Sequence, residues 1–231
     1  MTRTRHWLVG LACVATCALA QADSDRLASD GDVAEAGDCD IELGRERKHI
    51  RGDTPERESS LRLACGIGWQ TELEAAFSRR HGSGARDQAI ALEAKTTLRE
   101  RERGSVGWAL AIGVASQRGS AVGWRRSEQF IALEATIEPA RDWLVEAKLG
   151  AARERSARID KTLWSMAVER TVSDGVELRA ELEGDDRGRP LMAVGLRWMF
   201  WPEHAVLKLS YGAVSGPLRE RRSGLAIKYG F

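Results

Sequence analysis

Acidic and basic side chains alternate with apolar ones along much of this 231-residue chain, and their spacing is its most chemically informative feature. Because successive side chains of a β-strand point to opposite faces, charged residues two positions apart share one face. We expect one enclosed polar face that carries Glu74, Glu93, Lys95, Glu134, Glu146, Lys148, Arg179, Glu181, Arg197, Lys208 and Lys228. Opposed charges at such close quarters must pair, either around a narrow polar pore that selects small solutes or in a salt-bridged network that closes the interior.

A hydrolytic site is the second chemistry that the residue types suggest. Ser78 and His81 lie close in sequence at the end of an expected strand, and His49 lies at another such end. A serine hydrolase needs its nucleophile, its base and an orienting group within hydrogen-bond reach, and no acid partner or nucleophile motif accompanies these residues. We therefore do not expect an enzyme. The histidines His49, His81 and His204 are too scattered for a metal site, and no cofactor is expected.

Units of about ten alternating residues, separated by turn residues, are the elements that must position these side chains. The expected strands are Cys39–Glu46, Ser60–Trp69, Glu72–Arg80, Gln88–Leu98, Ser105–Ser116, Gln129–Ile137, Trp143–Ala151, Thr162–Glu169, Val176–Glu183, Met192–Phe200, Ala205–Val214 and Ser223–Phe231. In Ser105–Ser116 only glycine and alanine occupy the polar face. This predicts one unobstructed wall, unless a bulky side chain from across the barrel, such as Phe130 or Leu144, covers it.

The first residues have the features of a secretory signal. Arg3 and Arg5 form a basic region, an apolar stretch follows, and residues 20–22 give an A-x-A cleavage site. We expect a signal peptide over residues 1–22, cleaved near Ala22, then a periplasmic segment over residues 23–37 and a barrel over residues 38–231. Beyond Ala22 no apolar run is long enough for a membrane helix, so a chain that stays in a membrane must do so as a barrel.

The chain ends on an alternating apolar strand with an aromatic carboxy-terminus, formed by Leu225, Ile227, Tyr229 and Phe231. That ending resembles the assembly signal of bacterial outer-membrane β-barrels. Taken as a whole, the chain is similar to the small, poorly characterised outer-membrane β-barrel proteins of Gram-negative bacteria. The resemblance implies the bacterial outer membrane as location, and outer-membrane lipid, lipopolysaccharide and the barrel assembly machinery as partners.

Aromatic residues test this interpretation. With the C-terminus at the periplasm, the aromatics expected near the periplasmic rim are Trp69, Trp108, Trp143, Trp198, Phe200, Trp201, Tyr229 and Phe231. Phe77, Trp164 and Tyr211 then lie toward the outer rim, in the pattern of interfacial girdles. Alternation alone does not distinguish a lipid-facing surface from the buried core of a soluble sandwich or lipocalin-like barrel.

Composition narrows the remaining choices. The net charge is +1 with acids and bases interspersed, which predicts no nucleic-acid partner. The two cysteines that remain after processing, Cys39 and Cys65, have the parity of the apolar face. They can meet across the first hairpin as a disulfide, or pack as small apolar side chains.

The sequence thus predicts an all-β fold, a single antiparallel up-and-down transmembrane β-barrel of about twelve strands. Its expected function is a narrow channel for passive passage of small hydrophilic solutes. The alternatives are a closed structural or adhesive barrel, whose arginine-rich outer loops touch lipid phosphates, and an outer-membrane lipid hydrolase.

Overall fold

The computed structural model describes residues 33–82, 85–102, 104–119, 123–155, 158–202, 204–214 and 220–231. Its strands are β1 (Cys39–His49), β2 (Glu56–Gly68), β3 (Thr71–Gly82), β4 (Ala85–Arg99), β5 (Val106–Arg118), β6 (Arg125–Ala140), β7 (Trp143–Glu154), β8 (Ile159–Ser173), β9 (Val176–Asp185), β10 (Leu191–Trp201), β11 (Ala205–Val214) and β12 (Arg221–Gly230). The expected signal peptide and its cleavage site lie outside the described residues.

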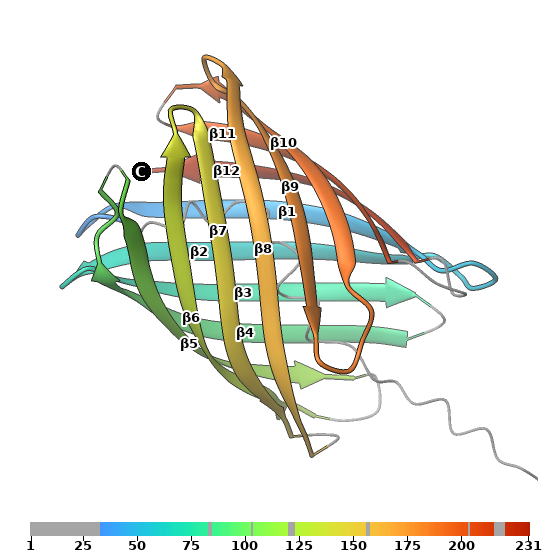
Figure 1. Ribbon diagram of the computed structural model, residues 1–231. Coiled ribbons are helices and arrows are strands. Elements are labelled where there is room, and N and C mark those ends of the chain that lie inside the picture. Colours follow the sequence, from blue (N-terminus) through green and yellow to red (C-terminus); the bar gives the residue numbers. More distant parts are fainter. Residues whose placement is uncertain are drawn as a thin grey trace, which may run out of the picture.

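Each strand pairs antiparallel with the next, and β12 returns to pair with β1, so the sheet closes into a barrel (Figure 1). At this seam Asp40 lies opposite Gly230. Beyond it Phe231 and Cys39 exchange two main-chain hydrogen bonds, of 2.8 and 2.9 Å. The twelve-strand, up-and-down, all-β prediction is confirmed. We call the end of the barrel that holds Phe231 the C-terminal rim, and the opposite end the far rim.

The outward face of the barrel is apolar and exposed. Leu43, Leu149 and Met192, for example, are 60%, 62% and 59% exposed. Among the described residues the buried apolar side chains are alanines and Leu191, so there is no large apolar core. An apolar surface of this extent is unfavourable in water and matches the lipid-facing wall of a transmembrane barrel. A soluble sandwich would instead bury these side chains between two sheets. The described residues contain no helix that is long and apolar enough to cross a bilayer.

Exposed aromatic side chains concentrate at the C-terminal rim. Trp69 is 92% exposed and Phe231 63% exposed. Tyr229 lies 6.3 Å from Phe231 and 6.2 Å from Trp201, measured between ring centroids. Rings with one apolar body and a polar tip are favoured at the membrane interface, so this rim has the composition of an interfacial girdle.

Several strands extend further toward the far rim than the apolar alternation predicts. Strand β2 begins at Glu56 instead of Ser60, and β6 begins at Arg125 instead of Gln129. The hydrogen-bond ladder continues past the apolar belt, where the outward side chains become arginine and serine. Pairing of main-chain groups does not require apolar side chains, so the strands continue after the hydrophobic signal stops.

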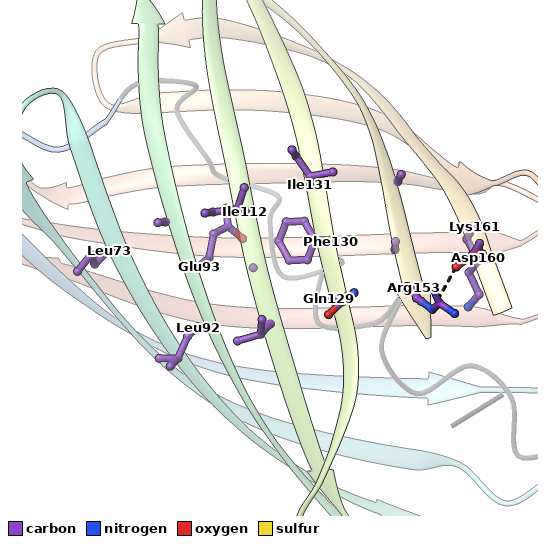
Figure 2. Close-up of a pocket in the computed structure, with 15 residues that line it drawn as sticks. Leu73, Leu92, Glu93, Ile112, Gln129, Phe130, Ile131, Arg153, Asp160 and Lys161 are labelled. Carbon is purple, nitrogen blue, oxygen red and sulfur yellow. Dashed lines mark ion pairs between the residues drawn. The ribbon is translucent and has the colours of Figure 1, made fainter. Parts of the chain in front are cut away.

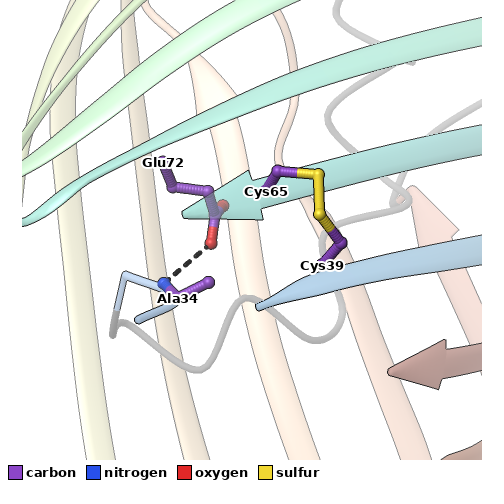
Figure 3. Close-up of a disulfide and its surroundings, with 4 residues drawn as sticks. All are labelled: Ala34, Cys39, Cys65 and Glu72. Atoms are coloured by element: carbon purple, nitrogen blue, oxygen red, sulfur yellow. Dashed lines mark hydrogen bonds between the residues drawn. A yellow bond between two sulfur atoms is a disulfide. The ribbon is translucent and has the colours of Figure 1, made fainter. Parts of the chain in front are cut away.

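A disulfide joins Cys39 to Cys65 at the C-terminal rim of the first hairpin (Figure 3). The two residues lie directly opposite each other in the register of β1 and β2, with their Cα atoms 4.2 Å apart. Both side chains belong to the outward-facing set, with Ile41 and Leu63. The sequence allowed either a disulfide or two cysteines packed as small apolar side chains, and the structure contains the disulfide.

Candidate solute pathway

The inner face of the barrel carries a band of ion pairs that we call the inner charged band. On the β4–β7 wall, the Glu134 carboxylate of β6 forms ion pairs with the Lys95 amine at 3.3 Å and with the Lys148 amine at 3.2 Å. Lys95 reaches Glu134 from β4 by passing over β5, where Ala111 is fully buried beneath it. A larger residue on β5 would block this crossing, so the small side chains of β5 permit the pair.

Arg179 of β9 is the centre of the band on the next wall. Its guanidinium lies 2.6 Å from Glu146, 3.4 Å from Glu181 and 3.6 Å from Glu169. To reach Glu146 on β7 it crosses β8 near Ala167, which lies opposite Glu146 in register. A guanidinium has five donors in a planar fork, so one arginine can serve several carboxylates.

Arg197 of β10 extends the band, with ion pairs of 2.9 Å to Glu177 and 3.4 Å to Glu169. Lys208 of β11 then pairs with Glu42 of β1, and both side chains are almost fully buried. Two further pairs complete the band, Lys228 with Asp40 at 3.0 Å and Arg62 with Glu74 at 3.5 Å.

The structure places on the inner face all eleven residues that the sequence assigned to the polar face. Sequence reasoning missed Asp40, Glu42, Arg62 and Glu169, which pair with members of that set. The signal was present, because each has the parity of the polar face in its own strand. Glu42 was missed because it lies in the most charged of the expected strands.

Acidic side chains outnumber basic ones on the inner face. The inward acids of the strands are Asp40, Glu42, Glu46, Glu56, Glu58, Glu72, Glu74, Asp87, Glu93, Glu128, Glu134, Glu146, Glu154, Glu169, Glu177, Glu181, Glu183 and Asp185. The inward bases are Lys48, Arg62, Arg80, Lys95, Arg125, Lys148, Lys161, Arg179, Arg197, Lys208, Arg222 and Lys228. The inner face therefore has an excess of negative charge, although the whole chain is nearly neutral.

The small-residue wall of β5 is not bare, so the expectation of an unobstructed wall is wrong. The ring of Phe130, from neighbouring β6, lies against Gly113, and a Cβ at Gly113 would collide with it. At Gly107 a Cβ would come within 2.9 Å of Arg101. The alternative, in which Phe130 covers this wall, is the observed one, and the ring comes from the adjacent strand.

A groove of about 600 Å³ crosses the wall formed by β3 to β8 near Phe130 (Figure 2). Most of its lining residues, such as Leu92, Ile112 and Ile131, belong to the outward-facing set. At one end Arg153 pairs with Asp160 at 3.6 Å. We assign this groove to the lipid-facing surface and not to the solute pathway.

The candidate hydrolytic residues do not form a site. Ser78 and His81 lie an odd number of positions apart on β3, so Ser78 faces the interior and His81 faces outward. A nucleophile and a base on opposite faces of one strand cannot share a hydrogen bond. His49 is exposed on the outward face of β1. Within the described residues no group of histidine, cysteine and carboxylate side chains is arranged to hold a metal.

The residues before β1 lie against the inner wall at the C-terminal rim (Figure 3). The Ala34 N–H donates to the Glu72 carboxylate at 3.0 Å, and the Gly37 N–H donates to the Gly66 carbonyl at 2.9 Å. Gly66 is required here, because a Cβ would collide with the main-chain oxygens of Ala34 and Glu35. Residues 33–37 are the described part of the segment that the sequence placed in the periplasm.

Comparison with solved structures finds membrane barrels at low sequence identity. The "KdgM porin in complex with disordered oligogalacturonate" is 14% identical, with a TM-score of 0.61 over 82% of this chain and 99% of that one. The "COG4313 outer membrane channel from Pseudomonas putida F1" is 12% identical, with a TM-score of 0.60 over 88% and 99%. Outer membrane phospholipase A from Escherichia coli is 11% identical, with a TM-score of 0.52 over 83% and 89%. Identities this low show a shared fold alone.

Comparison with sequences gives two further results. A family model described as "Uncharacterised conserved protein UCP029691" matches residues 10–213. No curated protein sequence matches the chain.

Proposed function

The chain belongs to the family described as "Uncharacterised conserved protein UCP029691", because the family model matches residues 10–213. We propose that the protein forms a narrow outer-membrane channel for small hydrophilic solutes, with a preference for cationic and neutral ones. The proposal rests on the fold of a transmembrane barrel and on the charge and arrangement of its inner face.

The arrangement of the inner charged band carries the proposal. Each pair described above lies within one strand, as Arg179 with Glu181 on β9, or joins strands that are adjacent or separated by one strand, as Lys95 on β4 with Glu134 on β6. Such pairs hold their long side chains along the wall. A plug that closed the lumen would need pairs between opposite walls. The observed pattern therefore favours a lined pathway over a closed interior.

The excess of carboxylates supports the charge preference. Cross-strand neighbours on the inner face include three directly opposed glutamate pairs, Glu46 with Glu58, Glu74 with Glu93, and Glu128 with Glu154. A confined pathway with low-dielectric walls strengthens the field of its lining charges, so it attracts cations and repels anions. The oligogalacturonate named with the KdgM porin is a polyanion, and an acid-rich inner face argues for solutes of a different charge here.

Planar-bilayer conductance of the purified, folded barrel tests this proposal. Under a KCl gradient we expect discrete conductance steps and a reversal potential that shows cation selectivity. Glu181→Gln with Glu183→Gln should shift the reversal potential toward zero, because both side chains face the interior. Asp160→Asn, an acid on the outward face, is the matched control and should leave it unchanged.

The outcomes separate the alternatives. Anion selectivity would overturn the charge preference while leaving a channel. A folded, heat-modifiable barrel that inserts and never conducts would replace the channel with the closed structural barrel.

A further inference from the structure

A cluster of cationic side chains lies on the outward face of β12, β1, β2 and β3 near the far rim. We call it the basic rim patch, and its members are Arg45, Arg47, Arg57, Arg79 and Arg221, with His49 and His81 beside them. All seven side chains are exposed. Each has the strand parity of the lipid-facing residues, so the patch lies on the outside of the wall and not in the lumen or in a loop.

Strand register brings like charges face to face within the patch. Arg47 lies directly opposite Arg57, and Arg57 lies directly opposite His81 on its other side. In the next row Arg45 and Arg79 flank Ser59. Directly opposed like charges destabilise an antiparallel pair. The patch therefore carries an electrostatic cost that an anion bound between its arginines would remove.

The described residues supply no such anion. The acids of the same strands, such as Glu46 and Glu58, point to the interior. The outward strand positions next to the patch include Ser59, Ser223, Gln88 and apolar residues, and none of them is acidic. None of the five arginines takes part in a salt bridge or a side-chain hydrogen bond with the described part of the chain. Within the described residues no acid occupies their guanidinium donors, which can therefore bind a partner outside the protein.

On the described strands β7 to β11 the far rim does not share this property. On β7 and β8 the outward Arg153 is neutralised by Asp160. On β9 to β11 the outward residues near the same rim are uncharged, at Gly184, Met192 and Ala213. Four of the twelve strands, β12 and β1 to β3, lie side by side and therefore carry the largest group of exposed outward cations without an acid partner among the described residues (Figure 1). Exposed Arg118 of β5 and Arg126 of β6 add two more on a neighbouring part of the wall.

The level of the patch on the wall indicates its partner. Directly next to it toward the C-terminal rim lie the exposed apolar side chains of Leu43, Leu61, Phe77 and Leu225. Apolar residues at this level contact acyl chains, so the arginines lie at the level of the lipid head groups. Arginine binds phosphate through two parallel hydrogen bonds, which makes it suited to phosphorylated head groups.

We propose that the basic rim patch binds the phosphate groups of a phosphorylated glycolipid in the outer leaflet, of the lipid A type, whose acyl chains pack on the apolar belt below. The proposal is independent of conduction, because the patch and the lumen lie on opposite faces of the same strands.

Binding of diphosphorylated lipid A to the folded barrel in phosphatidylcholine nanodiscs tests the proposal. The triple variant Arg47→Gln, Arg57→Gln and Arg79→Gln should weaken binding by about tenfold or more, since each loses charge-assisted hydrogen bonds to phosphate. Arg153→Gln is the matched control, an exposed outward arginine at the same rim that already has an acid partner. It should bind as the unsubstituted protein does. Heat-modifiable mobility of each variant checks that the barrel is folded, and Arg57→Gln alone should give a smaller loss if the triple variant folds poorly.

Two further binding experiments distinguish lipid phosphate from free phosphate. Enzymatically dephosphorylated lipid A should bind the unsubstituted protein as weakly as intact lipid A binds the triple variant. Inorganic phosphate at the same concentration as the lipid should not compete. The proposal is overturned if the triple variant keeps full binding, if the dephosphorylated lipid binds equally well, or if inorganic phosphate displaces lipid A.

Discussion

Lys208 on β11 pairs with Glu42 on β1 across the full width of β12, passing the methyl group of Ala226. Lys208 lies opposite Ala226 in register, and both charged side chains are almost completely buried. The same arrangement, an ion pair that crosses a middle strand above a small residue, occurs where Lys95 passes over β5 and where Arg179 passes over β8. Small residues on the middle strand let long side chains bind three strands together.

Removing one partner of this pair is expected to cost more than removing both. Glu42→Gln or Lys208→Met should each lower the free energy of unfolding by about 3–5 kcal/mol, because each leaves a buried charge uncompensated. The double variant should cost much less than the sum. Equilibrium denaturation in detergent micelles measures the cycle. The exposed pair Arg153 and Asp160 is the control, with an expected coupling below about 1 kcal/mol.

Gly66 is expected to hold the segment before β1 against the inner wall. In Gly66→Ala the new Cβ meets the main-chain oxygens of Ala34 and Glu35, which cannot rotate away. We expect the segment to lose about 1–3 kcal/mol of local stability, as overpacked sites do. Hydrogen exchange of a peptide that contains residues 33–38 should rise while the strands keep their protection.

Gly44→Ala is the matched control for that experiment. Its Cβ meets the hydroxyl of Ser60, a side-chain group that can rotate. Exchange at residues 33–38 should then stay unchanged. Equal exchange in the two variants would mean that contact with Gly66 does not hold the segment.

Deleting Phe231 should weaken closure of the barrel. Its N–H donates to the Cys39 carbonyl and its carbonyl accepts from the Cys39 N–H, so the deletion removes the last two bonds of the β1–β12 seam. The expected result is a lower yield of the heat-modifiable form in the outer-membrane fraction, with secretion unchanged. Phe231→Tyr, which keeps the main chain and the ring, should assemble normally. Normal yield from the deletion variant would contradict a role for this residue in closure.

The disulfide should stabilise the barrel through its unfolded state. Cys39 and Cys65 are 26 residues apart, a loop whose closure is worth about 3 kcal/mol or somewhat more in the chain-entropy model. Cys39→Ser with Cys65→Ser should lower the free energy of unfolding by up to that amount without changing conductance. Denaturation of the unsubstituted protein with and without a reductant gives the same comparison independently.

Most of the fold could be predicted from sequence because lipid-facing apolar residues and lumen-facing polar residues alternate strictly along each strand of a membrane barrel. Every expected strand overlaps an observed one, and β11 has the expected bounds. The inner positions of Lys95 and Arg179 followed from parity alone. Pairs such as Arg179 with Glu146 could not be predicted, because they cross an intervening strand, and only the register shows which small residue lies between.

The basic rim patch escaped the sequence prediction for a physical reason. The expected strands stop where apolar side chains stop, so Arg47 and Arg57 were assigned to a loop that joins the first two strands. In the structure β1 and β2 continue through these residues, and alternation sends Arg57 outward and Glu58 inward. Extending the parity of each strand through its charged end would have separated the two sets.

The alternation of outward Arg57 and inward Glu58 also limits which insertions and deletions the strand can tolerate. Inserting or deleting a single residue within β2 would exchange its two faces, turning carboxylates toward lipid and leucines toward the lumen. The register shifts that the barrel already contains lie mostly beside the turns of the C-terminal rim, as between Gly66 and Gly68 or between Thr171 and Ser173. Among homologous sequences, insertions and deletions should therefore occur in the turns and loops, while the strands should differ by substitution.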